Sequence, residues 1–126
     1  MRIIVKLPYP HNVWGITISL KRDIGFLFTN QSIFNFRENV GIQTSEDYER
    51  WMKENGETRL VTEMMYGAAQ AYCQAAVKRQ RFTKTKLTQA IAAAPVEVQQ
   101  SIVSAWRKSQ TFGLVESKKK RMIKRS

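Results

Sequence analysis

Hydrophobic positions near the N-terminus follow the period of a β-strand. The segment "RIIVKL" (2–7) is short, apolar and β-branched, and "ITISL" (16–20) alternates large aliphatic residues with threonine and serine. A period of two is typical of strands that bury one face. The proline-containing "PYPHNVWG" (8–15) and the polar "KRDIG" (21–25) indicate turns, and "FLF" (26–28) is a third candidate strand. The pattern therefore predicts a small N-terminal β-hairpin or sheet.

From about residue 30 onward, the spacing of apolar residues changes to that of a helix. Ile33, Phe36 and Val40 fall on one face of a first helix. Gly41 suits the left-handed backbone that commonly ends helices, and Gly56 is a second expected stop. Five helices are predicted, over residues 30–40, 46–55, 58–80, 87–94 and 96–110. The expected N-caps carry a hydroxyl or amide group: Thr29 or Asn30, Thr44 or Ser45, and Thr83 or Thr85.

The third predicted helix, residues 58–80, is the longest and is rich in alanine. It is apolar over much of its circumference, which is typical of a helix buried on several sides. Gly67, Ala71 and Ala75 are four residues apart, so they form a stripe on which another helix can come close. We therefore expect this helix to be the central packing element, and a bulky residue at position 71 or 75 to overpack the core.

Positive charge is concentrated in the second half of the chain. The 126 residues carry a formal net charge of +11, with 43% hydrophobic residues, which is compatible with one domain. Basic and acidic residues balance in residues 1–64, so residues 65–126 carry the whole excess. Such asymmetry indicates an acidic partner, either nucleic acid or an acidic protein surface. The alternative is a lysine-rich surface that serves solubility.

These patterns together predict an α+β protein that is mostly α. Residues 1–115 are expected to form a single globular domain, with a β element in 1–28 and a compact helical bundle in 30–113. The basic segment 116–126 reads as a C-terminal tail. No apolar run approaches the ~20 residues that a membrane span needs, so no membrane partner is expected.

The residue types needed for catalysis or metal binding are scarce. The chain has one histidine, His11, and one cysteine, Cys73, which are too few for a zinc site. His11 follows two prolines in a predicted loop, which favours a structural role. Cys73 lies among alanines and is expected to be an inert small hydrophobe. We therefore expect a protein that is not an enzyme and that uses no cofactor or metal.

Basic residues are the strongest candidate for a binding function. They surround Phe82 in one segment and fill the tail in another, and such runs can hold phosphates while an aromatic ring stacks a base. The alternative is a solvated helix end followed by a flexible tail. The candidate phosphate or acidic-partner contacts are Lys78, Arg79, Arg81, Lys84 and Lys86, and in the tail Lys118, Lys119, Lys120, Arg121, Lys124 and Arg125.

The order of elements over residues 16–113 resembles the tail assembly chaperones of long-tailed bacteriophages. The resemblance rests on an apolar strand before a helix that ends at Gly41, and on the tyrosine and small residues of "YGAA" (66–69). A helix that begins with "LT" (87–88) and a final amphipathic helix over 102–109 complete the pattern. The N-terminal "RIIVKLPYPHNVWG" and the basic C-terminus depart from it.

The resemblance implies a helical, non-enzymatic protein of the infected host cell's cytoplasm. It would bind the tape-measure protein and keep it soluble until tail-tube subunits assemble. The short predicted helices 30–40 and 46–55 are rich in aromatic residues, which suits a helix-in-groove contact. The candidate partner-binding residues are Phe34, Phe36, Tyr48, Trp51 and Tyr66. The alternative function is a small basic nucleic-acid-binding protein, associated with phage or virion, that uses residues 78–86 and the tail.

Overall fold

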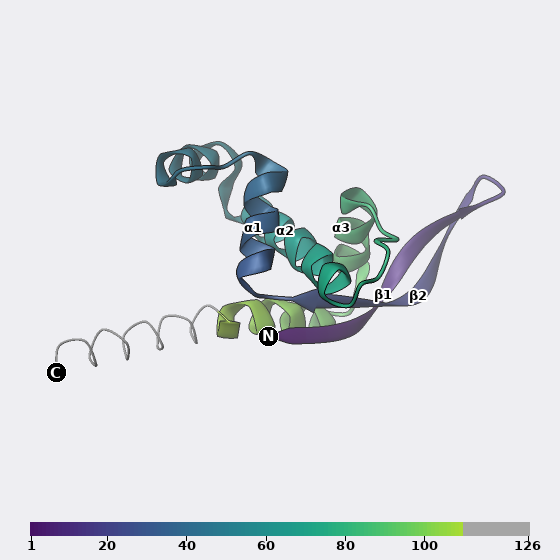
Figure 1. Ribbon diagram of the computed structural model, residues 1–126. Coiled ribbons are helices and arrows are strands. Elements are labelled where there is room, and N and C mark those ends of the chain that lie inside the picture. Colours follow the sequence, from purple (N-terminus) through teal and green to yellow (C-terminus); the bar gives the residue numbers. More distant parts are fainter. Residues whose placement is uncertain (110–126) are drawn as a thin grey trace.

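The computed structural model describes residues 1–109 and has a two-stranded antiparallel sheet followed by four helices (Figure 1). The α+β, mostly α class is therefore as predicted. Five helices are not confirmed, because the second and third predicted helices form one element. The predicted tail, 116–126, lies outside the described residues. The elements are β1 (Arg2–Val13), β2 (Ile16–Leu27), α1 (Asn30–Val40), α2 (Ser45–Ala75), α3 (Lys84–Ala93) and a helix over 96–109.

The two strands form a much longer hairpin than the sequence pattern predicted. They pair from Arg2 opposite Leu27 as far as Val13 opposite Ile16. Trp14 and Gly15 connect them with φ angles of 54° and 77°, and positive φ at both positions is what a two-residue type I′ turn requires. The predicted loop over 8–15 and turn over 21–25 are therefore wrong, and "FLF" is not a separate strand.

Pro8 and Pro10 favoured the prediction of a loop because proline is rare inside sheets. A two-stranded sheet has only edge strands, where proline is tolerated. The two prolines are two residues apart, so they occupy the same kind of pair in the antiparallel ladder. Both can therefore lie where the N–H group would point away from the partner strand, and the ladder continues past them.

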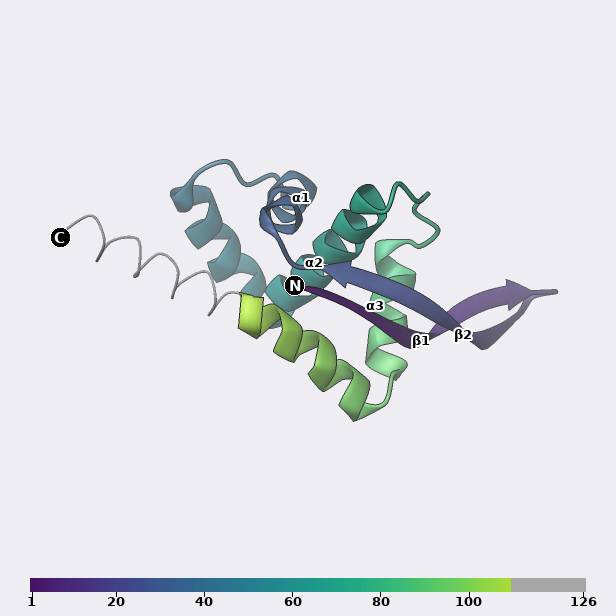
Figure 2. The ribbon, with the colours of Figure 1, turned by 60° about the horizontal axis from the view of Figure 1, so that its bottom comes forward.

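Only the end of the hairpin that lies against the helices, here called its root, is buried. Leu7, Tyr9, Ile24 and Phe26 lie on one face of the strands and belong to the main core. The other end projects away from the helices as a free arm (Figures 1 and 2). Trp14, at its tip, is 97% exposed. The exposed large hydrophobic side chains of this arm are Val13, Trp14, Ile16, Ile18 and Leu20.

Side-chain caps set the helix starts near the predicted positions. Thr44 caps α2, with its Oγ1 accepting a hydrogen bond of 3.1 Å from the Asp47 N–H. The Asp47 carboxylate accepts hydrogen bonds from the backbone N–H groups of Gln43 and Thr44, which lower its pKa. Thr83 caps α3 in the same way. These side chains satisfy N–H groups that the first helical turn leaves without partners.

Helix α2 bends sharply at Gly56 and ends earlier than expected. Gly56 has φ 81° and ψ 178°, so the helical backbone is interrupted where a stop was predicted. The helix then runs to Ala75, and not to residue 80. Val77 follows in a left-handed conformation (φ 52°), and the Lys78 N–H donates to the Cys73 carbonyl at 2.8 Å. This reversal directs the basic connection back toward the hairpin.

Helix α1 packs very closely on α2 at Gly67. A Cβ atom at this position would lie 2.8 Å from the Ser32 carbonyl oxygen, so only glycine fits without a shift of backbone. Asn35 Nδ2 donates to the Gly67 carbonyl at 3.0 Å. Ser32 and Asn35 occupy this contact, and Ile33 is left exposed. Of the predicted face of Ile33, Phe36 and Val40, Phe36 is therefore buried and Val40 half-buried, and Ile33 is the part that is not covered.

A single core joins the hairpin to three helices. Met65, Ala68 and Ala69 of α2 pack with the hairpin root and with Leu87 of α3. Ile102 belongs to the same cluster, so the helix over 96–109 closes it. A smaller cluster, Phe36, Ile42 and Met64, lies between α1 and α2. The second half of α2 is therefore the central packing element, as the alanine content predicted.

We expect Ala71→Leu to destabilise the fold, whereas Ala75→Leu leaves it unchanged. Ala71 is 1% exposed, and added methylene groups in a packed core typically cost about 1–3 kcal/mol. Ala75 is exposed at the end of α2, so the earlier expectation of overpacking at position 75 is wrong. Chemical denaturation of both variants measures the two free energies of unfolding. Equal stability of the two variants would contradict the packing described here.

Candidate functional site

An apolar groove lies on the inner side of the bend in α2. It has a volume of about 420 Å³. Tyr48 and Glu49 come from the part of α2 before Gly56, and Leu60 and Met64 from the part after it. The bend therefore creates the groove by facing the two parts of one helix toward each other. The remaining walls come from α1, the segment after it, the first residue of α2 and the last helix: Ile33, Phe36, Arg37, Ile42, Thr44, Ser45 and Trp106.

Two of the five predicted partner-binding residues line the groove. Tyr48 lines it and is exposed, whereas Phe36 is 3% exposed and lies at its base. Trp51 packs edge-to-face on Phe36, with ring centroids 5.5 Å apart, so it supports the groove from behind. Phe34 is 54% exposed but is not among the lining residues. Tyr66 lies elsewhere, against the basic connection.

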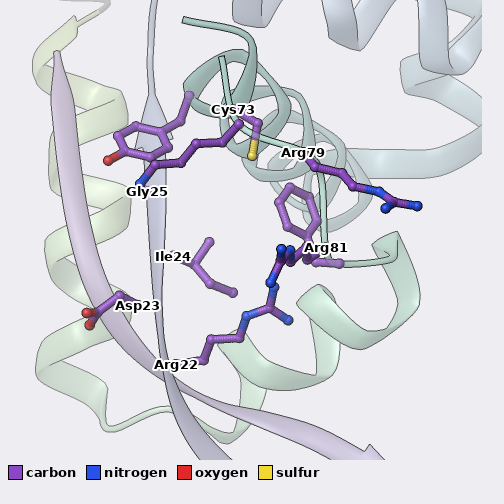
Figure 3. A pocket seen from close by; sticks show the side chains of 10 residues that line it. Arg22, Asp23, Ile24, Gly25, Cys73, Arg79 and Arg81 are labelled. Carbon is purple, nitrogen blue, oxygen red and sulfur yellow. The ribbon is translucent and has the colours of Figure 1, made fainter. Parts of the chain in front are cut away.

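A second cavity, of about 330 Å³, lies between β2 and the connection from α2 to α3 (Figure 3). Arg22 enters it from the hairpin, and Lys78, Arg79 and Arg81 come from the connection. The polar pattern of residues 21–25 predicts a turn, so Arg22 was not among the predicted site residues. The sequence feature that could have identified Arg22 is the strand alternation, which puts position 22 on the same face as Ile24.

Aromatic rings hold two of these cations in place. The Arg22 guanidinium carbon lies 4.8 Å from the centre of the Tyr9 ring, and Lys78 Nζ lies 5.8 Å from that of Tyr72. The Tyr72 ring in turn covers Gly25, where any Cβ atom would lie 2.5 Å from the ring. Gly25 thus allows the helix end and the connection to approach the strand closely.

Phe82 does not offer a ring for base stacking. It is buried and packs edge-to-face on Tyr66, with ring centroids 6.1 Å apart. Gln80 Nε2 donates to the Tyr66 hydroxyl at 3.0 Å and to the Phe82 carbonyl at 3.1 Å. Phe82 therefore anchors the basic connection to the domain, and the predicted role in stacking is wrong.

The predicted basic cluster is divided by the fold. Lys84 turns inward, and its Nζ lies 2.9 Å from the Glu63 carboxylate, which is 1% exposed. Arg59 contributes a second contact to the same oxygen at 3.3 Å. Lys86 lies on α3 and does not line the cavity. The tail residues Lys118, Lys119, Lys120, Arg121, Lys124 and Arg125 lie outside the described residues.

Cys73 lines the cationic cavity. Burial raises the pKa of this thiol, and the nearby positive charges of Lys78 and Arg22 oppose the increase only in part. His11 lies in β1 and packs edge-to-face on Tyr9, with ring centroids 5.8 Å apart. In residues 1–109, no group of three potential ligand side chains is arranged to hold a metal ion.

Comparisons with family models, with curated proteins and with solved structures find no match to this chain. In the described part of the chain, no helix has the length and apolar character to cross a membrane. Two surfaces of the described residues bear on function: the apolar groove at the bend of α2 and the cationic cavity beside β2.

We expect Lys84→Met to lower the free energy of unfolding by about 1–3 kcal/mol. Removing one partner of a buried ion pair typically costs ~3–5 kcal/mol because a charge is left uncompensated. The cost is smaller here because Arg59 remains and the Lys84 side chain is 38% exposed. Lys86→Met is the matched control, and denaturant titration compares the two variants. Similar losses in both would show that the Glu63 pair contributes nothing specific.

Proposed function

We propose that this protein is a tail assembly chaperone of a long-tailed bacteriophage that acts by binding, without catalysis. The resemblance in element order suggests this class. The observation that supports it best is the apolar groove at the bend of α2, because an amphipathic partner helix can lay its apolar face into such a groove. The tape-measure protein is the proposed partner, and the cytoplasm of the infected cell is the proposed location.

The form of the groove suits a helical partner. Ile33 and Tyr48 are exposed on its two sides, while the buried Phe36 forms its base. Large aromatic and aliphatic side chains at the centre of a contact contribute most of the binding energy. Arg37 and Glu49 place opposite charges on the lining, so they can orient a helix that carries both signs.

The hairpin arm supplies a second apolar surface for the same task. Ile16, Ile18 and Leu20 project from one face of β2 beyond the part that the helices cover. Contiguous exposed apolar surface is typical of sites of protein association. A chaperone that keeps a long partner soluble must cover apolar surface on that partner, and the arm extends the reach of the domain.

Substitutions in the groove should abolish capture of the tape-measure protein. We expect Ile33→Asp and Tyr48→Asp each to weaken binding about 30-fold or more, since loss of a central contact costs 2 kcal/mol or more. The measurement is a pull-down from nuclease-treated, phage-infected cells, with the tape-measure protein identified by mass spectrometry. Phe34→Asp is the matched control, because Phe34 is exposed on α1 outside the groove. Equal loss in the control would place the contact elsewhere.

The second candidate function is nucleic-acid binding through residues 78–86 and the tail. It is favoured by the absence, within residues 1–109, of any salt bridge to Lys78, Arg79 or Arg81. Cations without carboxylate partners are available to neutralise phosphates, and each such contact releases counterions.

For this second candidate, affinity for DNA should fall steeply with salt. We expect the slope of log affinity against log salt to become about 0.7–0.9 less negative for each phosphate contact removed, as in Arg79→Gln. Fluorescence anisotropy between low and physiological salt measures the slope. Deleting residues 117–126 tests the tail in the same assay. DNA binding that neither change affects would exclude these segments.

A further inference from the structure

Two guanidinium groups from distant parts of the chain meet in the cationic cavity. Figure 3 shows Arg22 reaching from β2 toward Arg81 of the basic connection. They are separated by the whole of α1 and α2 in sequence, so the fold alone brings them together. Asp23, the carboxylate of the lining, points away from the space between them (Figure 3).

The positive charge of this cavity is not balanced by the described protein. In residues 1–109, neither Arg22 nor Arg81 forms a salt bridge, and the same holds for Lys78 and Arg79. The chain does pair cations where it buries a carboxylate, as Lys84 and Arg59 do with Glu63. Like charges held near each other in a partly enclosed space repel, and an anion between them would remove that repulsion.

The surroundings favour a compact anion with several charges. Arg22 is half-buried and its position is set by the Tyr9 ring, while the adjacent Phe82 anchors the segment that carries Arg81. Guanidinium groups present forked N–H donors that match the oxygens of a phosphate. The volume of about 330 Å³ is at the small end of ligand pockets, which span roughly 300–1,000 Å³.

We propose that the cavity is a phosphate-binding site in which Arg22 and Arg81 hold the anion and Lys78 lies at the rim. A phosphate group supplies more negative charge and more acceptor oxygens than one carboxylate does. Lys78 lies over one face of the Tyr72 ring, and the buried Phe82 packs edge-to-face on Tyr66, so the proposed contacts are to the phosphate itself and not to a base. The site is separate from the groove and holds whether or not the groove binds a partner helix.

The single cysteine of the chain provides a direct reporter of occupancy. Cys73 lines the cavity, so a bound anion should shield its thiol from a neutral alkylating reagent. An anion also weakens the positive potential that favours the thiolate, which slows alkylation further. We expect inorganic pyrophosphate to slow the reaction of Cys73 with iodoacetamide in a saturable manner, in the full-length protein at low salt.

Variants distinguish a specific anion-binding site from a general effect of positive charge. Arg22→Gln and Arg81→Gln should each weaken pyrophosphate binding about tenfold or more, because each removes charge-assisted hydrogen bonds. Arg22→Lys keeps the charge but loses the fork, so its affinity should fall between those of the wild type and Arg22→Gln. Arg50→Gln is the control, since it removes the same charge from an exposed position on α2 that does not line the cavity. Circular dichroism confirms that each variant is folded.

Two further probes identify the source of the phosphate. A single-stranded oligonucleotide that competes with pyrophosphate and shares the dependence on Arg22 and Arg81 would assign the phosphate to nucleic acid. Binding of pyrophosphate but not of the oligonucleotide would assign it to a small phosphorylated ligand. The proposal is overturned if pyrophosphate gives no saturable protection, if Arg50→Gln is as damaging as Arg81→Gln, or if a glutamate-rich peptide binds more tightly than pyrophosphate.

Discussion

The close approach of other elements to the second half of α2 is the constraint on which this fold depends. A 2.8 Å separation between the Ser32 carbonyl and a Cβ at Gly67 leaves no room for a side chain there. Ala68 and Ala69 present only methyl groups to the core that contains the hairpin root. Apart from Met65, the large buried residues of this core come from the neighbours of α2, among them Leu7, Phe26, Leu87 and Ile102. The second half of α2 is therefore a narrow central helix, and its neighbours on both sides must supply the side chains that fill the core to the density typical of protein interiors.

Both candidate surfaces follow from how the second half of α2 begins and ends. At its start, Gly56 breaks the helical backbone and turns the preceding part back, so an apolar groove opens between the two parts of α2. At its end, Val77 takes a left-handed conformation and sends the basic connection along β2. A valine with positive φ is strained, and such strain persists only where surrounding contacts hold it. The burial of Phe82 is one such contact.

Some cations of residues 1–109 pair with a buried carboxylate, whereas those around the cationic cavity do not. Glu63 is buried, yet two cations reach the same carboxylate oxygen. Around the cavity beside β2, four cations meet without a described ion pair. Net charge alone showed that an acidic partner was expected, but it did not distinguish these two situations. Lys84 and Arg81 are three residues apart, and the fold gives one a structural partner and leaves the other open to a ligand.

The sequence by itself determined the elements whose signals are local. The caps at Thr44 and Thr83, the left-handed Gly41, the interruption at Gly56 and the packing role of the alanine-rich helix all depend on a few neighbouring residues. Only the tertiary structure decided the rest. The prolines of β1 are tolerated because, within residues 1–109, the sheet has two strands and both are edges, and the exposed face of α1 was set by the Asn35 contact to Gly67. Strand alternation gives the face on which Arg22 lies, but it does not show that the connection after α2 lies beside that face. Contacts between residues so far apart in sequence depend on shapes that exist only once the chain has folded.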